Sequence, residues 1–254
     1  MKLLVLGNSD YNGSLMEDSL QSWPHLVGER LGKELGMPVE VVNLNLVPSR
    51  RSVLTEVEDL IQEHRPELVV VGLNPYSFAV RTVATRVRQR FGARAAKTYT
   101  RLEHAFDRRT HKGRVRTALN RTMRAATRRT IGVAPLAPVE QIIETYRAVF
   151  ARLSREEQLQ AVVMGGSKLS LRYASPAVLA QVDRFRVEMK QAAEAHHFAF
   201  FDTEQTVVGP DRESYFMPDG VHRNERGHER LAEMVYPVVA AELARLGLAP
   251  AGSP

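Results

Sequence analysis

Five short, almost entirely apolar runs, separated by longer amphipathic stretches, constrain the fold of this chain more than any other feature of its sequence. The runs are Leu3–Gly7, Val39–Asn43, Leu68–Gly72, Ala161–Met164 and Phe198–Phe201. Apolar runs of this length are typical of strands that are covered on both faces of a parallel sheet. The stretches between them repeat apolar residues at helical spacing. The sequence therefore predicts repeated strand–helix units around a parallel sheet.

Helix signals stand at the expected places between these runs. Ser22 with Pro24, and Ser175 with Pro176, each read as a capping serine followed by a proline in the first helical turn. We expect both serines to cap their helices. The predicted apolar stripes run through Trp23–Leu35, Val53–Ile61, Leu179–Met189 and Leu231–Leu243.

One long segment interrupts this alternation and differs in charge. From about residue 78 to residue 138 we expect no strand, only a basic helical pattern. The window Arg81–Arg129 holds sixteen basic and two acidic residues, a net charge of +14, so the rest of a chain with a total of +6 carries −8. We expect a single domain over residues 1–254, with a basic helical insertion at about 78–138 after the third strand.

The insertion has a plain interpretation and two functional ones. It forms a solvated helical face, a lid over a pocket, or a surface that docks an anionic partner or substrate. Its aromatic residues are sparse, Phe91, Tyr99 and Phe106, which disfavours nucleic acid as the partner because single strands bind by stacking on aromatic rings.

Composition excludes several classes of protein. The chain has no cysteine, so disulfide scaffolds, thiolate zinc sites and cysteine nucleophiles are ruled out. No apolar run approaches the roughly 18 residues of a membrane-spanning helix, and the opening apolar run is too short for a signal peptide. We expect a cytoplasmic protein without a transmembrane segment. His196-His197 reads as a helix end rather than a metal site, and no dinucleotide-binding glycine motif occurs, so we expect neither metal nor cofactor.

Polar residues gather at three points where the predicted sheet ends. The first strand runs into Gly7-Asn8-Ser9-Asp10, the third ends in Gly72-Leu73-Asn74, and Asp219-Gly220-Val221-His222 precedes the last helix. Ligands of parallel sheets bind at the carboxyl ends of the strands. The hydroxyl, carboxamide, carboxylate and imidazole found here are the groups that acyl transfer uses. Taken singly, each segment also reads as an ordinary turn, as Gly165-Gly166 does after the fourth run.

As a set, these segments resemble the blocks of the SGNH hydrolases, the GDSL-like esterases and lipases. Gly7-Asn8-Ser9 with Gly13 is similar to the first block, Gly72-Leu73-Asn74 to the third, and Asp219-Gly220-Val221-His222 to the fifth. The resemblance spans nearly the whole chain in the family's order. It implies a three-layer, flavodoxin-like α/β fold, with a five-stranded parallel sheet and helices on both faces.

The resemblance also implies an activity, that of a serine ester hydrolase acting on a small-molecule or lipid-like acyl ester through an acyl-enzyme. Ser9 is then the nucleophile, His222 the general base, and Asp219 the residue that orients the imidazole. The side chain of Asn74 and the backbone N–H of Ser9 donate to the oxyanion. We expect the substrate to border Asn8, Asp10, Gly72 and Pro75.

Two departures from the family pattern motivate an alternative. Asn8 stands where the family has an aspartate. No glycine occurs between Gly36 and Gly72, so the second-block glycine of the oxyanion hole is replaced, by position, by Asn45. Asparagine tolerates a left-handed backbone better than most residues, which would let its N–H point inward. The alternative is a catalytically altered or acyltransferase protein of the same fold, whose basic insertion binds an anionic partner or substrate.

Overall fold

The computed structural model describes residues 1–9, 11, 16, 18–109, 129–166, 174–207, 211–220 and 222–248, with backbone alone at 103–109. The chain divides into two compact units. Unit 1 comprises Met1–Pro75 together with Val139–Pro254, and unit 2 is Tyr76–Pro138. Unit 2 therefore covers the segment in which the sequence changes its charge.

A five-stranded parallel sheet in the order β2-β1-β3-β6-β7 forms the centre of unit 1. Its strands are β1 (Lys2–Gly7), β2 (Glu40–Asn45), β3 (Leu68–Gly72), β6 (Gln160–Gly165) and β7 (Ala199–Asp202). All five predicted strands are confirmed, with shifts of no more than two residues at their ends. The four residues Leu3 to Leu6 have no exposed surface, because helices cover both faces of β1.

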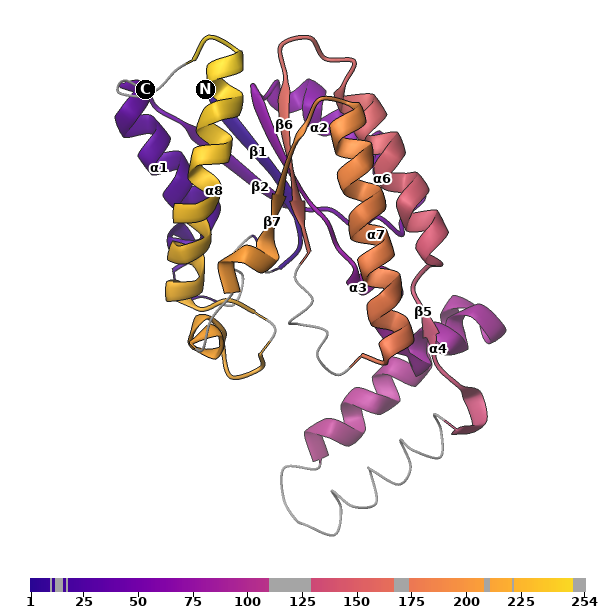
Figure 1. Ribbon diagram of the computed structural model, residues 1–254. Helices are drawn as coiled ribbons and strands as arrows, with labels where there is room; N and C mark the ends of the chain where they lie inside the picture. The colour runs from indigo at the N-terminus through magenta and orange to yellow at the C-terminus, as the bar shows by residue number, and fades with distance from the viewer. Residues whose placement is uncertain are drawn as a thin grey trace. The chain divides into compact units, whose positions relative to one another are not determined.

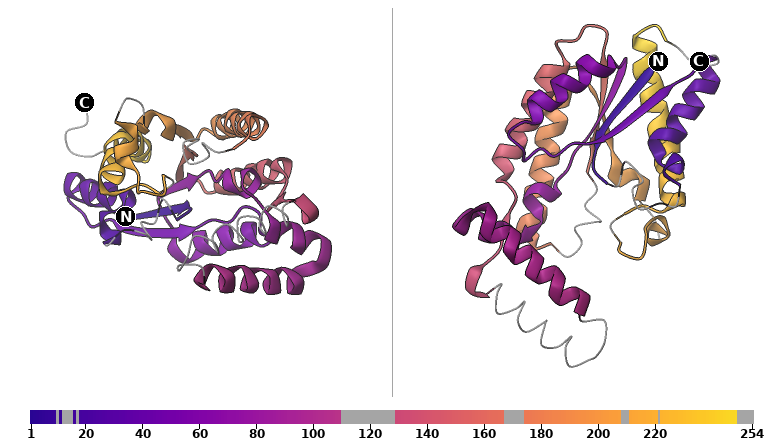
Figure 2. Two further views of the ribbon diagram at one scale, coloured as in Figure 1. Left: turned by 90° about the horizontal axis from the view of Figure 1, so that it is seen from below. Right: turned by 180° about the vertical axis from the view of Figure 1, so that it is seen from behind.

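Helices form a layer on each side of this sheet, as Figures 1 and 2 show. One layer contains α1 (Trp23–Leu35) and α8 (Glu225–Arg245), and the other contains α2 (Val53–His64), α6 (Val139–Leu153) and α7 (Pro176–Ala195). Buried side chains of α1 and α8 form one core with the inward residues of the sheet. The predicted three-layer α/β architecture is confirmed. Helix α6 lies outside the stripes that we expected.

The two predicted caps differ in outcome. The hydroxyl of Ser175 accepts a hydrogen bond from the Val178 N–H at 3.4 Å and caps α7, as predicted. Ser22 stands at the N-cap position of α1, but its buried hydroxyl makes no capping bond, so that prediction is wrong. The cause is local, since Pro24 has no N–H to donate and the His25 N–H bonds the Ser22 carbonyl oxygen at 3.0 Å.

Two short strands near the ends of unit 2 pair in a small ribbon. Strand β4 (Arg81–Thr82) pairs in antiparallel fashion with β5 (Ala134–Pro135), and α3 (Tyr76–Ala79) precedes it. The expectation that this segment contains no strand is therefore wrong. Apolar alternation cannot signal a strand of two residues, and this ribbon forms because the two ends of the segment run side by side.

Helix α4 (Val83–Arg109) follows the ribbon and is interrupted at Gly92, whose backbone is non-helical with a φ of 86°. The side chains of Val83 and Val87 in its first part are buried. Within the described ranges, no helix of the chain combines the length and the apolar character needed to cross a membrane.

Candidate active site

Strand β1 delivers Ser9 to the carboxyl end of the sheet, and Tyr11 fixes the turn that follows. The Tyr11 N–H donates to the Asn8 carbonyl oxygen at 2.9 Å. The Tyr11 ring lies so close to two strand ends that a Cβ atom on Gly7 would be 2.5 Å from its Cγ, and one on Gly72 would be 2.7 Å from its Cζ. Glycine at the ends of β1 and β3 therefore makes room for the ring that holds the Ser9 turn against the sheet.

A tight loop carries the other two residues of the predicted triad, Asp219 and His222. The Met217 N–H donates to the His222 carbonyl oxygen at 2.8 Å, and the Gly220 N–H donates to the Met217 carbonyl oxygen at 2.8 Å. Gly220 has a φ of 65°, in the left-handed region that favours glycine. The Asp219-Gly220 turn thus brings Asp219 and His222 together on one tight loop.

Asn224 anchors this loop to the start of α8. Its Nδ2 group donates to the carbonyl oxygens of Ser214 at 2.8 Å and Phe216 at 3.1 Å. Its Oδ1 atom accepts from the Gly227 N–H at 3.0 Å and caps the helix. Our sequence reasoning missed Asn224, although an asparagine directly before the helical pattern is a recognisable N-cap signal. The two hydrogen bonds that its Nδ2 group donates to the loop could not be predicted, because no local sequence pattern indicates them.

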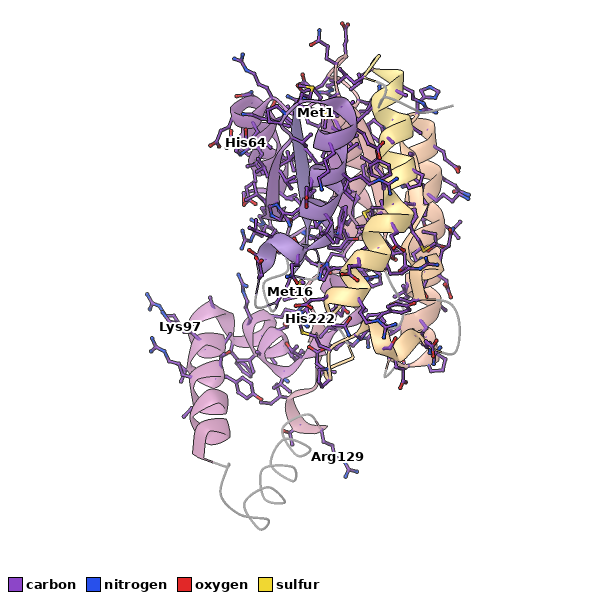
Figure 3. All side chains as sticks on the ribbon, turned by 90° about the vertical axis from the view of Figure 1, so that its left-hand side faces the viewer. Met1, Met16, His64, Lys97, Arg129 and His222 are labelled. Atoms are coloured by element: carbon purple, nitrogen blue, oxygen red, sulfur yellow. The ribbon has the colours of Figure 1, made fainter. Side chains whose placement is uncertain are left out.

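Ser9, His222 and Asp219 form a continuous hydrogen-bonded chain. The Ser9 Oγ lies 3.1 Å from His222 Nε2, and His222 Nδ1 lies 2.7 Å from Asp219 Oδ2. The His222 backbone N–H also donates to Asp219 Oδ1, at 3.0 Å. A carboxylate only accepts hydrogen bonds, so in the neutral ring Nδ1 carries the proton and Nε2 presents its lone pair to the Ser9 hydroxyl. In Figure 3, His222 lies at the end of unit 1 opposite Met1, where β1 ends.

The segment that carries Asn74 is held by the buried side chain of Tyr146 on α6. The Asn74 backbone N–H donates to the Tyr146 hydroxyl at 2.9 Å, and that hydroxyl donates to the Gly72 carbonyl oxygen at 3.1 Å. Burial raises the pKa of Tyr146, so the hydroxyl keeps its proton. Tyr146 was not identified from the sequence either, because in the sequence it resembles any other inward-facing residue of an amphipathic helix.

Strand β6 supports the same segment from the other side. The Leu73 N–H donates to the Met164 carbonyl oxygen at 2.9 Å. A Cβ atom on Gly166 would lie 2.7 Å from both the Leu73 carbonyl oxygen and the Pro75 ring. The turn after β6 therefore packs directly on the residues that flank Asn74.

The geometry of β2 gives little support to Asn45 as an oxyanion donor. Asn45 is the last residue of β2 and lies beside Gly7, and the Leu46 N–H donates to the Gly7 carbonyl oxygen at 2.7 Å. Because successive N–H groups of a strand point in opposite directions, the Asn45 N–H points to the free edge of the sheet, away from β1. Its backbone is not left-handed, since Arg65 and His197 are the non-glycine residues with positive φ in the described ranges.

The other predicted site residues flank Ser9 and Asn74 or lie outside the described ranges. Asn8 is half-buried directly before Ser9, and Gly72 and Pro75 are buried on either side of Asn74. Asp10, Gly13 and Val221 lie outside the described residues. Within the ranges that the structure describes, the Ser9 N–H makes no hydrogen bond.

Two histidine features have structural explanations. His196 is the C-cap residue of α7 and His197 follows it with a φ of 59°, which confirms the predicted helix end. His228 is buried, and its Nδ1 accepts the Trp23 N–H at 3.2 Å, joining α8 to the start of α1. Among the described side chains, no three metal-ligating groups come together.

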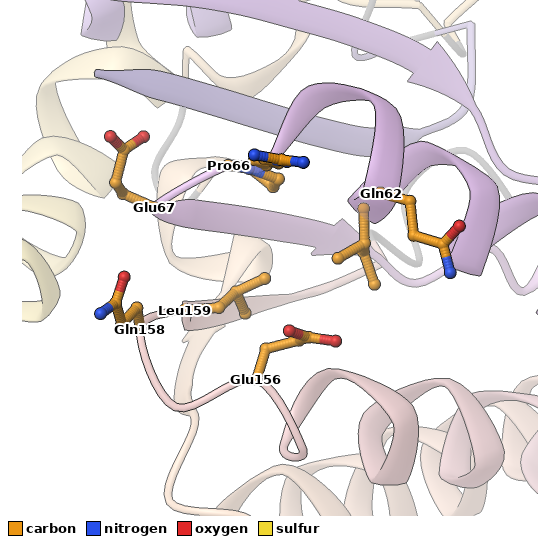
Figure 4. A pocket seen from close by; sticks show the side chains of 8 residues that line it. Gln62, Pro66, Glu67, Glu156, Gln158 and Leu159 are labelled. Carbon is orange, nitrogen blue, oxygen red and sulfur yellow. The ribbon is translucent and has the colours of Figure 1, made fainter.

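A cavity of about 390 Å³ lies at the opposite, amino-terminal end of β3 and β6 (Figure 4). Its lining residues are Ile61, Gln62, Arg65, Pro66, Glu67, Glu156, Gln158 and Leu159. The Glu67 carboxylate accepts the Lys2 backbone N–H at 2.7 Å, and that of Glu156 pairs with Arg152 at 2.6 Å. Both carboxylates therefore serve contacts of the fold.

Comparison with solved structures identifies the architecture. The crystal structure of TesA aligns at 19% identity over 97% of this chain and 99% of that chain, with a TM-score of 0.58. The psychrotrophic esterase EstA from Pseudoalteromonas sp. aligns at 12% identity over 96% and 98%, with a TM-score of 0.56. A protein assigned to the lipolytic G-D-S-L family, from Desulfitobacterium hafniense DCB-2, aligns at 11% identity over 93% and 98%, with a TM-score of 0.54.

The chain has an SGNH-hydrolase-like fold. Neither a protein-family model nor a curated protein sequence matches it. The likeness is therefore one of three-dimensional structure, and it extends over nearly the full length of both partners in each alignment.

Proposed function

We propose that the protein is a serine ester hydrolase that acts on an acyl ester through an acyl-enzyme on Ser9. The observation that carries this proposal is the hydrogen-bonded chain from Ser9 Oγ through the His222 ring to Asp219 Oδ2, with distances of 3.1 and 2.7 Å. A hydroxyl, an imidazole and a carboxylate in this order form a nucleophile, its base and the group that orients the base. Proteins of the same fold include an esterase and a lipolytic protein, which favours an ester substrate.

In the first half of the reaction, Ser9 Oγ attacks the ester carbonyl carbon while His222 Nε2 takes the hydroxyl proton. The carbonyl oxygen becomes an oxyanion, and Asp219 stabilises the imidazolium that forms beside it. Collapse of the tetrahedral intermediate breaks the bond to the alcohol oxygen, which takes the proton from Nε2 and departs. The acyl group then remains on Ser9.

In the second half, water replaces the alcohol. Nε2 takes a proton from water as its oxygen attacks the acyl carbon, and collapse of the second intermediate breaks the bond to Ser9 Oγ. The serine recovers its proton from Nε2 and a carboxylic acid is released. Ser9 is exposed and the Asp219 side chain has an exposed fraction of 42%, so solvent reaches the reactive groups. This exposure favours hydrolysis over transfer to another acceptor.

The side chain of Asn74 and the backbone N–H of Ser9 are the proposed oxyanion donors. Loss of one such donor typically lowers the rate by about 10²–10³-fold. Asn8 removes one negative charge from the position before the nucleophile, which favours a developing anion there. We leave the Asn45 N–H out of the set because of its direction in β2.

Hydrolysis of p-nitrophenyl acetate and of longer p-nitrophenyl esters tests this function. We expect Ser9→Ala and His222→Ala to lower kcat by at least about 10³-fold, and Asp219→Asn by about 10²–10⁴-fold, because the wrong tautomer of His222 is then favoured. Ser154→Ala and His64→Ala are matched controls, since neither residue lies in this hydrogen-bonded chain. Wild-type protein that hydrolyses none of the esters, or a Ser9→Ala variant with full activity, contradicts the proposal.

A further inference from the structure

The described side chains of unit 2 have an unbalanced charge. Residues 76–102 and 129–138 contain eight basic and no acidic side chains, and all eight are exposed. Six of them stand on α4: Arg86, Arg88, Arg90, Arg94, Lys97 and Arg101. None of the eight forms an ion pair with a described side chain.

In unit 1, by contrast, several arginines form ion pairs with acidic side chains. Arg152 pairs with Glu58 and Glu156, Arg184 with Glu140 and Glu188, and Arg186 with Asp202 and Glu204. These pairs cancel positive charge locally. The positive charge of unit 2 is uncancelled among the side chains described, so it attracts a negatively charged surface.

The same unit exposes apolar side chains among these charges. Nine large apolar side chains of the described residues are exposed, and five of them belong to unit 2. They are Val80, Phe91, Leu102, Val133 and Leu136, with exposed fractions between 38% and 60%. Exposed apolar side chains interspersed with lysine and arginine are typical of helices that lie in a membrane interface, where the apolar groups enter the acyl boundary and the cations meet phosphate.

The geometry of α4 places exposed basic and apolar side chains next to one another. Beyond the interruption at Gly92, the positions of Arg94, Lys97 and Arg101 place them on one helical face, with Leu102 beside it. The Lys97 side chain projects outward from the helix in Figure 3. Before Gly92, the buried Val83 and Val87 fix the inner face, and the Arg90 guanidinium lies 5.6 Å from the centre of the exposed Phe91 ring.

We propose that unit 2 docks the protein on an anionic phospholipid surface through α4. Nucleic acid fits these residues less well, because Phe91 is the one exposed aromatic side chain on the described part of α4 and bases need several stacking partners. The binding itself does not depend on the proposed hydrolase chemistry.

Sedimentation with vesicles tests the docking. We expect wild-type protein to bind vesicles that contain phosphatidylglycerol, to ignore vesicles of phosphatidylcholine alone, and to bind more weakly as salt is raised. A basic residue near an anionic membrane contributes about fivefold in affinity, so the triple variant Arg94→Glu/Lys97→Glu/Arg101→Glu loses at least about a hundredfold. The matched control is Arg51→Glu/Arg65→Glu/Arg155→Glu, which changes three exposed arginines of unit 1 by the same total charge and keeps wild-type binding.

A second variant separates lipid from other anionic partners. Phe91→Ser/Leu102→Ser keeps every charge, and we expect it to weaken vesicle binding severalfold, because the apolar groups no longer enter the lipid. Far-UV circular dichroism verifies that each variant is folded. The proposal is overturned if wild type binds the two kinds of vesicle equally, if the two triple variants bind alike, or if a DNA duplex or an acidic protein binds while anionic vesicles do not. Because sedimentation reports binding alone, these outcomes are independent of whether Ser9 hydrolyses esters.

Discussion

At the scale of a single residue, the hydroxyl of Tyr146 connects the core of the fold to the segment that carries Asn74, a proposed oxyanion donor. It accepts the Asn74 N–H and donates to the Gly72 carbonyl oxygen from a fully buried position. In Tyr146→Phe, the Asn74 N–H and the Gly72 carbonyl oxygen both lose this partner. We expect the free energy of unfolding to fall by about 1–3 kcal/mol, and kcat for ester hydrolysis to fall by roughly tenfold because Asn74 loses its fixed position.

A double-mutant cycle distinguishes positioning from simple stability. If Tyr146 acts through Asn74, the losses of kcat in Tyr146→Phe and Asn74→Ala are not additive when combined. Phe150→Leu is the control, since it lowers stability by removing buried aromatic surface from α6, whereas Phe150 makes no hydrogen bond to the Gly72–Asn74 segment. A Tyr146→Phe variant with reduced stability and unchanged kcat would show that the hydroxyl does not act on the site.

Residues of this kind mark the limit of prediction from sequence. Ser9, Asn74, Asp219 and His222 are recognisable because each reactive group sits in a short local pattern at a predicted strand or helix end. Tyr146 acts through a bond to a residue 72 positions away, and no local pattern encodes such a contact. The direction of the Asn45 N–H likewise follows from the pairing of β2 with β1.

The start of α8 links helix stability to the His222 loop at the scale of an element. Asn224→Asp keeps the oxygen that caps the Gly227 N–H but loses the amide donors to the Ser214 and Phe216 carbonyl oxygens. We expect this variant to lose some stability, because a carboxylate oxygen cannot donate to these two carbonyl oxygens, and to have a lower kcat, because the loop that carries His222 is released. Asn224→Ala loses the cap as well, which costs about 0.5–2 kcal/mol of stability.

Thermal unfolding and ester kinetics on the same preparations check this expectation. Ser175→Ala provides the comparison, since it removes the cap of α7 and should lower stability without changing kcat. An Asn224→Asp variant as active as wild type would mean that the two amide bonds do not position His222.

Elements were predictable where burial dictates them. The strands are apolar throughout because both faces of the sheet are covered, and this made all five recognisable. The ribbon of β4 and β5 was not predictable, because each strand has two residues and its existence depends on where the two ends of unit 2 meet. The prediction that Ser22 caps α1 was wrong because Pro24 has no N–H to donate to its hydroxyl. The capping pattern that we applied did not take this proline into account.

At the scale of the whole molecule, Glu242 makes stability depend on pH. Its carboxyl is almost completely buried in α8, and burial raises its pKa above the usual value of 4.5 despite the Arg245 guanidinium 3.2 Å away. The folded state therefore binds this proton more tightly than the unfolded chain. This contribution is fully present below the usual pKa, is lost as pH rises towards the raised pKa, and is constant above it.

Glu242→Gln removes this dependence. We expect the variant to exceed wild type in free energy of unfolding at pH 7, with a difference that shrinks towards pH 4. Urea unfolding at pH 4, 5.5 and 7 measures it. A difference that stays constant across this range would show that the carboxyl has no raised pKa in the folded state.

Covalent labelling by a fluorophosphonate probe tests the proposed nucleophile most directly. Ser9 Oγ should displace fluoride from phosphorus as His222 takes the hydroxyl proton, and intact-mass and peptide analysis should find one adduct per chain, on Ser9. His222→Ala should abolish this adduct, while His64→Ala should leave it unchanged. An adduct on another residue, or none on wild-type protein at millimolar probe (about 1 mM, near the upper end of typical KM values), would contradict a catalytic Ser9.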